Sequence, residues 1–430
     1  MLEVVHKYIA PQWLTSKRLV VFEDQFTAGH LFPLNVLRPS WEIRSGLGSL
    51  GQWLAELRLA GYSVSLRPRS SLTLRSRELA GFDDDWPSEQ EPIVFLNGRV
   101  LHLPATKTPL PEAVVDSFGQ VLWAKLDGKT VSELSGSSGT LLAESLVKVI
   151  RASAEISTFG GEAAHFIWDY MALNQKLLAV GMAGEYKELM GSGNLEVSGG
   201  VQIVGTPMVF AGDGTVVMPG VVFDTTEGPV WIGRDTVIEP HCYLKGPLAL
   251  GDHCRVKAGA AIYGASTFGP HCRISGEISA SVMQGYCNKQ HSGFLGNSHL
   301  GEWVNLGADT TVSNLRNDYG NVKVKVNQKL VDSGRQFVGL ICGDHTKTGI
   351  NTMFNTGSVV GIGCNVYGGG YPPRFIRSFS WGGSDGFHVE PFERTAESAR
   401  LVMSRRGRNL TEAEIELMKE HYSNIVKQEN

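Results

Sequence analysis

Large apolar residues recur every six positions over one long stretch of the chain. This spacing matches neither the 3.6-residue period of an amphipathic helix nor the two-residue period of a half-buried strand. A six-residue period is typical of a parallel β-helix, in which each hexad forms one short strand and one corner. We therefore expect a three-sided prism whose interior is filled by Ile232, Ile238, Leu244, Leu250, Val256, Ile262, Phe268 and Ile274.

The cysteines and histidines of the repeat also follow its phase. Cys254 and Cys272 lie 18 residues apart, which is one full coil of such a prism. We interpret them as small inward fillers, since free cysteine behaves as a small hydrophobe and cytoplasmic proteins rarely carry disulfides. His253 and His271 should stack at a corner in the same way. These two histidines could be solvated turn residues or could form a metal site, and both interpretations stay open.

The repeat is interrupted twice. Its phase slips at residues 281–293, and residues 313–340 leave the hexad altogether as a long polar excursion. A second apolar column is expected between the interruptions, at Phe294, Leu300, Leu306 and Val312. The period then resumes at Cys342, Thr348, Phe354, Val360 and Val366.

The rest of the chain reads as two further parts. Residues 1–195 alternate between strand-like and helix-like segments, which favours an α/β domain with a mostly parallel sheet. We place the β-helix at 196–370 and a helical tail at 371–430. In the tail we expect a helix over 391–405 and a second one opened by a capping box, with Thr411 at the N-cap and Glu414 three residues later.

Composition excludes several classes of function. A net charge of −4 over 430 residues gives no electrostatic case for nucleic acid or a membrane surface. No apolar run approaches the roughly 20 residues of a membrane span, and the start of the chain lacks a signal-peptide pattern. We therefore expect a cytoplasmic protein.

One dinucleotide-like motif is also present, at Gly46-Leu-Gly-Ser-Leu-Gly. No buried strand leads into it, and no acidic residue ends the following strand, so we do not expect a nicotinamide site.

A regular prism has no cleft, so function is expected where the repeat breaks. The slip carries Lys289 and His291, and the excursion carries Asn314, Arg316 and Lys323. Histidine titrates near neutrality and suits the removal of a proton from a nucleophile. His291 is therefore the candidate general base.

These residues resemble a known family. The stretch from Gln290 to Asn314 is similar to the acetyltransferase half of the bifunctional enzymes that make UDP-N-acetylglucosamine, which carry G-H-L-x-Y-x-G-D…N-[IL]-G-A-G-T…N. The whole chain looks like the group of sugar nucleotidyltransferase-related chains beside that family. The motifs shared with that group are Arg38-Pro-Ser-Trp-Glu-Ile-Arg-Ser-Gly, Gly343-Asp-His-Thr-Lys-Thr, Ser378-Phe-Ser-Trp-Gly-Gly and Met403-Ser-Arg-Arg.

The resemblance implies a left-handed β-helix in a homotrimer, and acetyl transfer from acetyl-CoA to the amine of an amino-sugar 1-phosphate. His291 would be the base and Asn314 would hold the sugar or orient its amine. Lys323, Lys289 and Arg316 would meet the sugar phosphate, because cationic side chains bind phosphate strongly. Lys347 and Asn351 belong to the 347–365 stretch that would line the pantetheine groove.

The resemblance also has departures. The family tyrosine three residues after the base is Phe294, and the lysine twelve residues before it is Ser279. The Gly-rich loop that wraps nucleotide phosphates in pyrophosphorylases is missing, which leaves Arg38 and Arg44 as candidate contacts for a nucleoside triphosphate; Mg²⁺ is expected only if that domain is active.

Two alternatives stay open. The chain could be a sugar-1-phosphate nucleotidyltransferase whose β-helix only assembles the oligomer or binds an effector. It could also be a non-catalytic trimeric scaffold, since a fold does not by itself imply a function.

Overall fold

The computed structural model describes residues 8–24, 29–80, 92–106, 109–132, 134, 140–153, 156–158, 161–182 and 199–427. Contacts divide the chain into two compact units. The first comprises Met1–Leu31, Leu37–Ile43 and Gly48–Asp169, and the second comprises Phe32–Val36, Arg44–Leu47 and Tyr170–Asn430.

The first unit is built on one mixed sheet in the order β2-β1-β3-β6-β5-β7. Its strands are β1 (Arg18–Phe22), β2 (Ser63–Arg67), β3 (Ile93–Asn97), β5 (Ala113–Val115), β6 (Val121–Leu126) and β7 (Ile156–Thr158). The expected α/β class is confirmed, but β6 runs antiparallel to both β3 and β5, so the sheet is less parallel than the sequence suggests. A small ladder of β4 (Val100–His102) and β8 (Glu162–Ala163) lies outside it.

The helices of this unit are short. They are η1 (Pro11–Trp13), η2 (Ser40–Glu42), α3 (Leu50–Leu59), η3 (Ser70–Leu72), α4 (Thr73–Ala80), α5 (Gly128–Ser132) and α6 (Thr140–Ser153). Helix α3 begins with a capping box, because the Ser49 side chain accepts from the Gln52 backbone and the Gln52 side chain reaches back to Ser49. Two further helices, α7 (Asp169–Ala172) and α8 (Asn174–Met182), follow them along the chain.

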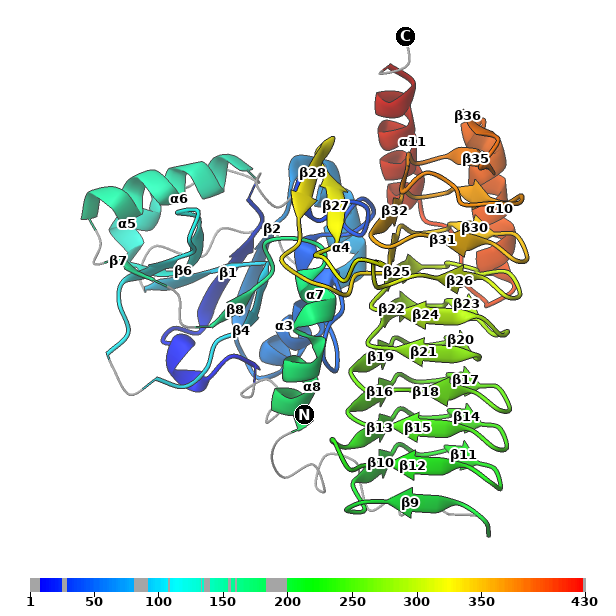
Figure 1. Ribbon diagram of the computed structural model, residues 1–430. Coiled ribbons are helices and arrows are strands. Elements are labelled where there is room, and N and C mark those ends of the chain that lie inside the picture. Colours follow the sequence, from blue (N-terminus) through cyan, green and yellow to red (C-terminus); the bar gives the residue numbers. More distant parts are fainter. Residues whose placement is uncertain are drawn as a thin grey trace. The chain divides into compact units, whose positions relative to one another are not determined.

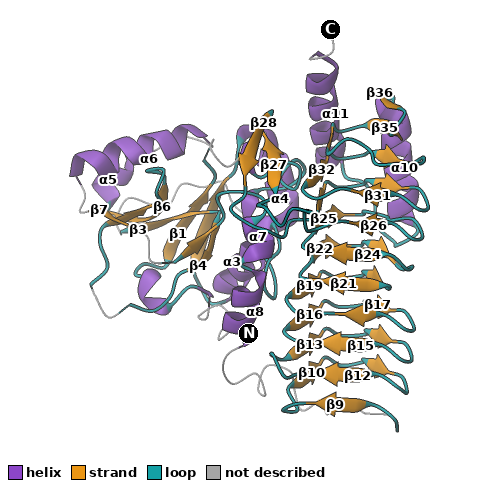
Figure 2. Cartoon of the chain, in the orientation of Figure 1, coloured by secondary structure: helices purple, strands orange, loops and turns teal. Residues whose placement is uncertain are grey.

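The second unit contains the expected parallel β-helix, whose strands stack as successive rungs in Figures 1 and 2. Its first wall consists of β10 (Val209–Ala211), β13 (Val230–Ile232), β16 (Leu248–Leu250), β19 (Ser266–Phe268), β22 (Val282–Gly285), β25 (His299–Glu302), β29 (Leu340–Cys342), β32 (Ser358–Val360) and β34 (Phe375–Ile376).

The other two walls are interrupted near the slip. One consists of β9 (Gln202–Val204), β12 (Val222–Asp224), β15 (Tyr243–Lys245), β18 (Ala261–Ile262), β21 (Glu277–Ser279) and β24 (Phe294–Gly296), with β26 (Thr311–Val312) and β31 (Met353–Phe354) paired beyond them. The other consists of β11 (Val216–Val217), β14 (Val237–Ile238), β17 (Arg255–Val256), β20 (Arg273–Ile274) and β23 (Asn288–Lys289), followed by β30 (Lys347–Thr348), β33 (Asn365–Val366), β35 (Ser380–Gly383) and β36 (Gly386–Val389).

The hexad column forms the interior of the prism. All eight residues from Ile232 to Ile274 are at most 1% exposed and share one core cluster. Regular coils repeat every 18 residues, as in the pairing of Leu250 with Phe268. Corners use left-handed backbone at residues such as His271, with φ of 59°. The cysteines Cys254 and Cys272 are free and buried, as expected of fillers.

The phase slip is a shortened coil. Ile274 pairs with Lys289, only 15 residues later, and Ile278 pairs with Leu295. Phe294 was the expected start of the second column, but it lies half-buried and Leu295 fills the interior instead. The error is one residue, which in a strand moves a side chain to the opposite face. The later column of Cys342, Thr348, Phe354, Val360 and Val366 is buried as expected.

The polar excursion ends in an antiparallel hairpin of β27 (Lys323–Val326) and β28 (Lys329–Asp332). Val322, Val324 and Val326 are buried while Lys323 is exposed, so one face of β27 packs against the β-helix. A Cβ on Gly357 would lie 2.7 Å from the Val322 side chain. The hairpin is thus anchored beside β32.

Two helices follow the prism, α10 (Phe392–Ser404) and α11 (Glu412–Lys427). The Thr411 amide donates to the Glu414 carboxylate, and the Glu414 amide donates to the Thr411 hydroxyl, which confirms the capping box. None of the helices described here is long and apolar enough to cross a bilayer.

We predict that Val256→Ala, at a fully buried position on β17, lowers the free energy of unfolding of the β-helix by about 2 kcal/mol, because methyl groups are lost from a filled core. The matched change Val216→Ala, on the same wall but 47% exposed, should be close to neutral. Denaturant titration followed by circular dichroism measures both. Equal effects would contradict the inward assignment.

Candidate active site

The shortened coil presents His291 at a corner between β23 and β24. Its side chain is exposed, so the imidazole points out of the prism rather than into it. The following residue, Ser292, is joined through its hydroxyl to the Asp309 carboxylate of the next coil. Gly293 has φ of 99°, and a Cβ there would lie 2.2 Å from the Thr310 carbonyl oxygen. The next coil therefore fixes the path of this corner.

Lys289 does not face solvent. Its side chain is 1% exposed and occupies the interior position that Ile274 fills one coil earlier. The ammonium donates to the backbone carbonyls of Ser275 at 3.2 Å, Ser292 at 2.9 Å and His291. These three bonds use all three of its N–H groups, so the expected phosphate-binding role of Lys289 is not retained.

Asn314 follows β26, which contacts β24. Its amide Nδ2 donates to the Asn297 Oδ1 at 2.8 Å, and a Cβ on Gly296 would lie 2.5 Å from both Asn314 Nδ2 and the Phe294 ring. Asn314 and Phe294 thus flank Gly296 on one wall of the prism. Because His291 precedes β24 and Asn314 follows the adjoining strand β26, the two lie toward opposite ends of this wall.

The two predicted phosphate contacts on the excursion differ, since Lys323 is exposed and Arg316 is paired. Lys323 lies on the outer face of β27 with its side chain exposed. Arg316 instead forms a bidentate pair with Asp318, and its Nε donates at 2.8 Å. The Arg316 guanidinium also holds the pKa of the Asp318 carboxyl down to about 2. Arg316 therefore orders its own loop, and Lys323 is the better placed of the two to meet a phosphate.

The predicted pantetheine contacts differ in their surroundings. Asn351 is exposed at a corner with φ of 55°. Lys347 lies mostly buried on β30, where its ammonium donates to the His345 carbonyl at 3.3 Å and burial lowers its pKa.

Helix α10 lies beside the wall that contains β30, as Figure 1 shows. A Cβ on Gly363 would lie 2.8 Å from the Thr395 side chain, and beyond the helix Arg406 donates to Asn288 Oδ1 at 3.2 Å. The sequence did not indicate that the chain's own tail covers this wall.

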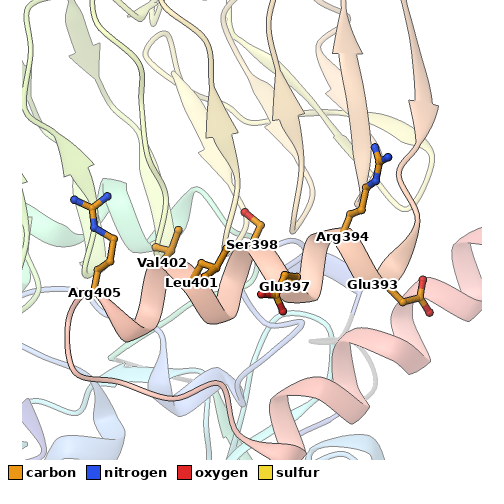
Figure 3. A pocket seen from close by; sticks show the side chains of 7 residues that line it. All are labelled: Glu393, Arg394, Glu397, Ser398, Leu401, Val402 and Arg405. Carbon is orange, nitrogen blue, oxygen red and sulfur yellow. The ribbon is translucent and has the colours of Figure 1, made fainter.

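A groove of about 600 Å³ lies along the outside of α10, as Figure 3 shows. It is lined by Glu393, Arg394, Glu397, Ser398, Leu401, Val402 and Arg405. All seven belong to one helix and its end, and none of the predicted site residues is among them. The groove is therefore separate from the His291 corner.

The corner histidines form a ring stack. His253 and His271 lie 4.7 Å apart at 16°, as the repeat predicts, and Tyr286 continues the stack at 4.7 Å from His271. Arg408 donates to the Tyr286 hydroxyl at 3.0 Å and lies over its ring. These rings pack against one another and against the segment that joins α10 to α11.

Neither arginine of the motif at residues 38–46 is exposed where a nucleotide could bind it. Arg38 and Arg44 are both buried. The Arg44 guanidinium donates to the backbone carbonyls of Gln284 at 3.2 Å and Leu47 at 3.3 Å, and its amide donates to the Gln284 side chain at 2.9 Å. Arg44 therefore fixes its own segment to β22, and its predicted role in nucleotide binding is replaced by a structural one.

The first unit places two carboxylates at the edge of the sheet where an α/β fold would bind a ligand. Asp24 follows β1 and Asp116 follows β5. The Arg99 guanidinium, fully buried, lies between them and donates to Asp24 at 2.9 Å and to Asp116 at 3.0 Å. Although burial alone raises the pKa of Asp116, hydrogen bonds from His165, the Gln120 amide and Arg99 lower it to about 2.

This arrangement does not fit Mg²⁺, which needs carboxylate oxygens free to complete an octahedral shell. The guanidinium already binds Oδ2 of both carboxylates and offsets one of their two negative charges. Elsewhere in the described part of the chain, no group of three or more His, Cys, Asp or Glu side chains could hold a metal ion.

We predict that Arg99→Met destabilises the first unit by about 3–5 kcal/mol, because two buried carboxylates lose their counter-charge. The control Arg151→Met, at an exposed position of α6, should change stability by less than about 0.5 kcal/mol. Amide exchange of β3 reports the effect. Equal exchange in both variants would show that Arg99 is not an internal counter-ion.

Comparison with known proteins shows partial relatives. A bifunctional sugar-1-phosphate nucleotidylyltransferase/acetyltransferase from Sulfurisphaera tokodaii is 36% identical over 100 residues, which are 23% of this chain and 25% of that protein. The bifunctional protein GlmU of Methanocaldococcus jannaschii is 40% identical over 90 residues, 21% of this chain and 22% of that protein. The chain thus spans about a quarter of the length of these curated relatives, and over the matched segments the expected resemblance is confirmed.

Two further results complete the comparison. No family model matches the chain. An N-acyltransferase from Bacillus cereus, solved with dTDP-4-amino-4,6-dideoxyglucose and coenzyme A, aligns with 51% of this chain and 96% of its own length at 13% identity and a TM-score of 0.20. A TM-score of this size does not establish a common fold.

Proposed function

We propose that the chain transfers an acetyl group from acetyl-CoA to the amine of an amino-sugar 1-phosphate. The observation that carries this proposal is an exposed imidazole, His291, at the shortened coil of a β-helix, on a wall that also presents Asn314. The segmental identity to bifunctional nucleotidyltransferase/acetyltransferases supports the reaction class.

The proposed chemistry needs no acyl-enzyme. A ring nitrogen of His291 accepts a proton from the sugar amine as the nitrogen attacks the thioester carbonyl. A C–N bond forms, the C–S bond of acetyl-CoA breaks, and the thiolate of coenzyme A leaves and takes up a proton. Asn314 donates from Nδ2 to Asn297, so its carbonyl oxygen is the atom available to accept a hydrogen bond from the amine.

Phosphate recognition is assigned to Lys323. The exposed ammonium lies on a hairpin whose inner face is anchored by buried valines, so the hairpin can hold it in one place. The β-helix, residues 196–370, would carry this reaction in a cytoplasmic homotrimer, and Asn351 remains a proposed contact of coenzyme A. The domain of residues 1–195 is not assigned nucleotidyl transfer, because its carboxylate pair is occupied by Arg99.

We predict that His291→Ala lowers kcat for acetyl transfer by about 10²–10⁴-fold, the usual contribution of a general base. The control His241→Ala removes an exposed histidine from a different corner, between β14 and β15, and should leave kcat unchanged. Release of coenzyme A thiol with glucosamine 1-phosphate measures both rates. If His291→Ala retains full activity, the base is misassigned.

We also predict that Lys323→Ala raises KM for the sugar phosphate by about 10–100-fold while kcat changes little, because a charge-assisted contact is lost from bound substrate. Lys329→Ala, an exposed lysine on the other strand of the same hairpin, is the matched control and should leave KM within about twofold. The same rise in both variants would point to general electrostatic attraction rather than a specific contact.

A further inference from the structure

A lysine occupies the apolar column of the prism at its shortest coil. Lys289 pairs with Ile274 in the β-ladder, and the amide of Leu306 donates to the carbonyl of neighbouring Asn288 at 2.9 Å on the other side. In the preceding coils the same position is filled by the aliphatic side chains of Val217, Ile238, Val256 and Ile274. Burying an ammonium is costly unless its hydrogen bonds are satisfied, so the surrounding backbone must compensate.

The compensation comes from the corner that carries His291. Two of the three acceptors of the Lys289 ammonium are the carbonyls of His291 and Ser292, and the third is Ser275 on the preceding coil. Two successive peptide groups of the corner therefore direct their oxygens into the prism. The imidazole of His291 is exposed on the outside of the same corner.

A glycine of the preceding coil packs against the ammonium and its acceptors. A Cβ on Gly276 would lie 2.8 Å from Lys289 Nζ and 2.8 Å from the His291 carbonyl oxygen. With φ of 74°, Gly276 also adopts a backbone conformation that favours glycine. A side chain at position 276 would therefore displace the ammonium or its acceptors.

From this geometry we infer that Lys289 is a positioning residue: its buried ammonium fixes the backbone of residues 290–293 from inside the β-helix and so holds the His291 imidazole in place. The catalytic part of this inference, that holding His291 in place matters for acetyl transfer, rests on the proposed function. It does not require Lys289 to touch a substrate, and it assigns the lysine a role different from phosphate binding.

The test compares Lys289→Met, which keeps an apolar stem but removes the donors, with Lys419→Met at an exposed position of α11. Amide exchange of residues 290–293 should accelerate about 10–100-fold in Lys289→Met, because charge-assisted hydrogen bonds are lost. In the transfer assay kcat should fall at least about tenfold with KM for acetyl-CoA within twofold. Lys419→Met should match the unaltered protein in every measurement.

The outcomes separate the two proposals. Unchanged exchange at 290–293 in a folded Lys289→Met protein would overturn the positioning role. Accelerated exchange in a protein that never shows acetyl transfer would leave Lys289 as the anchor of the corner and would reject the proposed function. Accelerated exchange with unchanged kcat would show that the corner does not position a base.

A measurement on the unaltered protein covers the case in which Lys289→Met fails to fold. Burial lowers the pKa of Lys289 to about 8, and the nearby Asp309 carboxylate opposes this shift. The buried thiols of Cys272 and Cys287 have pKa values raised well above the usual range, so they stay neutral. As the pH rises from about 7 to about 9, the ammonium loses a proton and one carbonyl loses its donor.

Exchange at 290–293, corrected for its intrinsic pH dependence, should therefore accelerate over that interval, while strand β17 should not change. Constant corrected exchange at 290–293 would contradict the inference.

Discussion

The filled interior of the prism is the constraint on which the rest of the second unit depends. Each coil must place one side chain from each wall into a narrow shared core, so the inward residues are fixed in size and phase. Where a coil keeps 18 residues, as between Leu250 and Phe268, its corners are uniform. Where it shrinks to 15, between Ile274 and Lys289, the period of the inward residues is broken, and the corner that carries His291 follows this break.

That irregular corner, the adjoining wall and the hairpin combine the residue types that a transferase needs. His291 faces outward, Asn314 follows the adjoining strand, and Lys323 is carried by a hairpin that packs through buried valines. The cost of the irregularity is an interior position that an aliphatic residue cannot fill, because backbone carbonyls point into it. Lys289 meets this requirement, because its ammonium donates to those carbonyls. The shortened coil and the buried lysine that stabilises it therefore occur together.

The six-residue period was sufficient to predict the β-helix, its inward column and its interruptions, because a prism of this kind buries one large apolar side chain at every sixth position. It could not reveal Lys289 as an interior residue, since the shortened coil breaks the period just before it. It also misplaced the first member of the second column by one residue, at Phe294 instead of Leu295, although Leu300, Leu306 and Val312 are buried as predicted. Contacts between residues that lie far apart in the sequence could not be predicted from local patterns. Arg99 meets Asp24 and Asp116, and Arg44 meets Gln284, only through the fold.

The central claim is that the broken coil is an acetyl-transfer site. The most direct measurement is thiol release from acetyl-CoA across a panel of hexosamine 1-phosphates, with pyrophosphate release from nucleoside triphosphates followed in parallel. We predict thiol release that requires both acetyl-CoA and an amino-sugar phosphate, without release of pyrophosphate. Pyrophosphate release with no thiol release from any member of the panel would contradict the account.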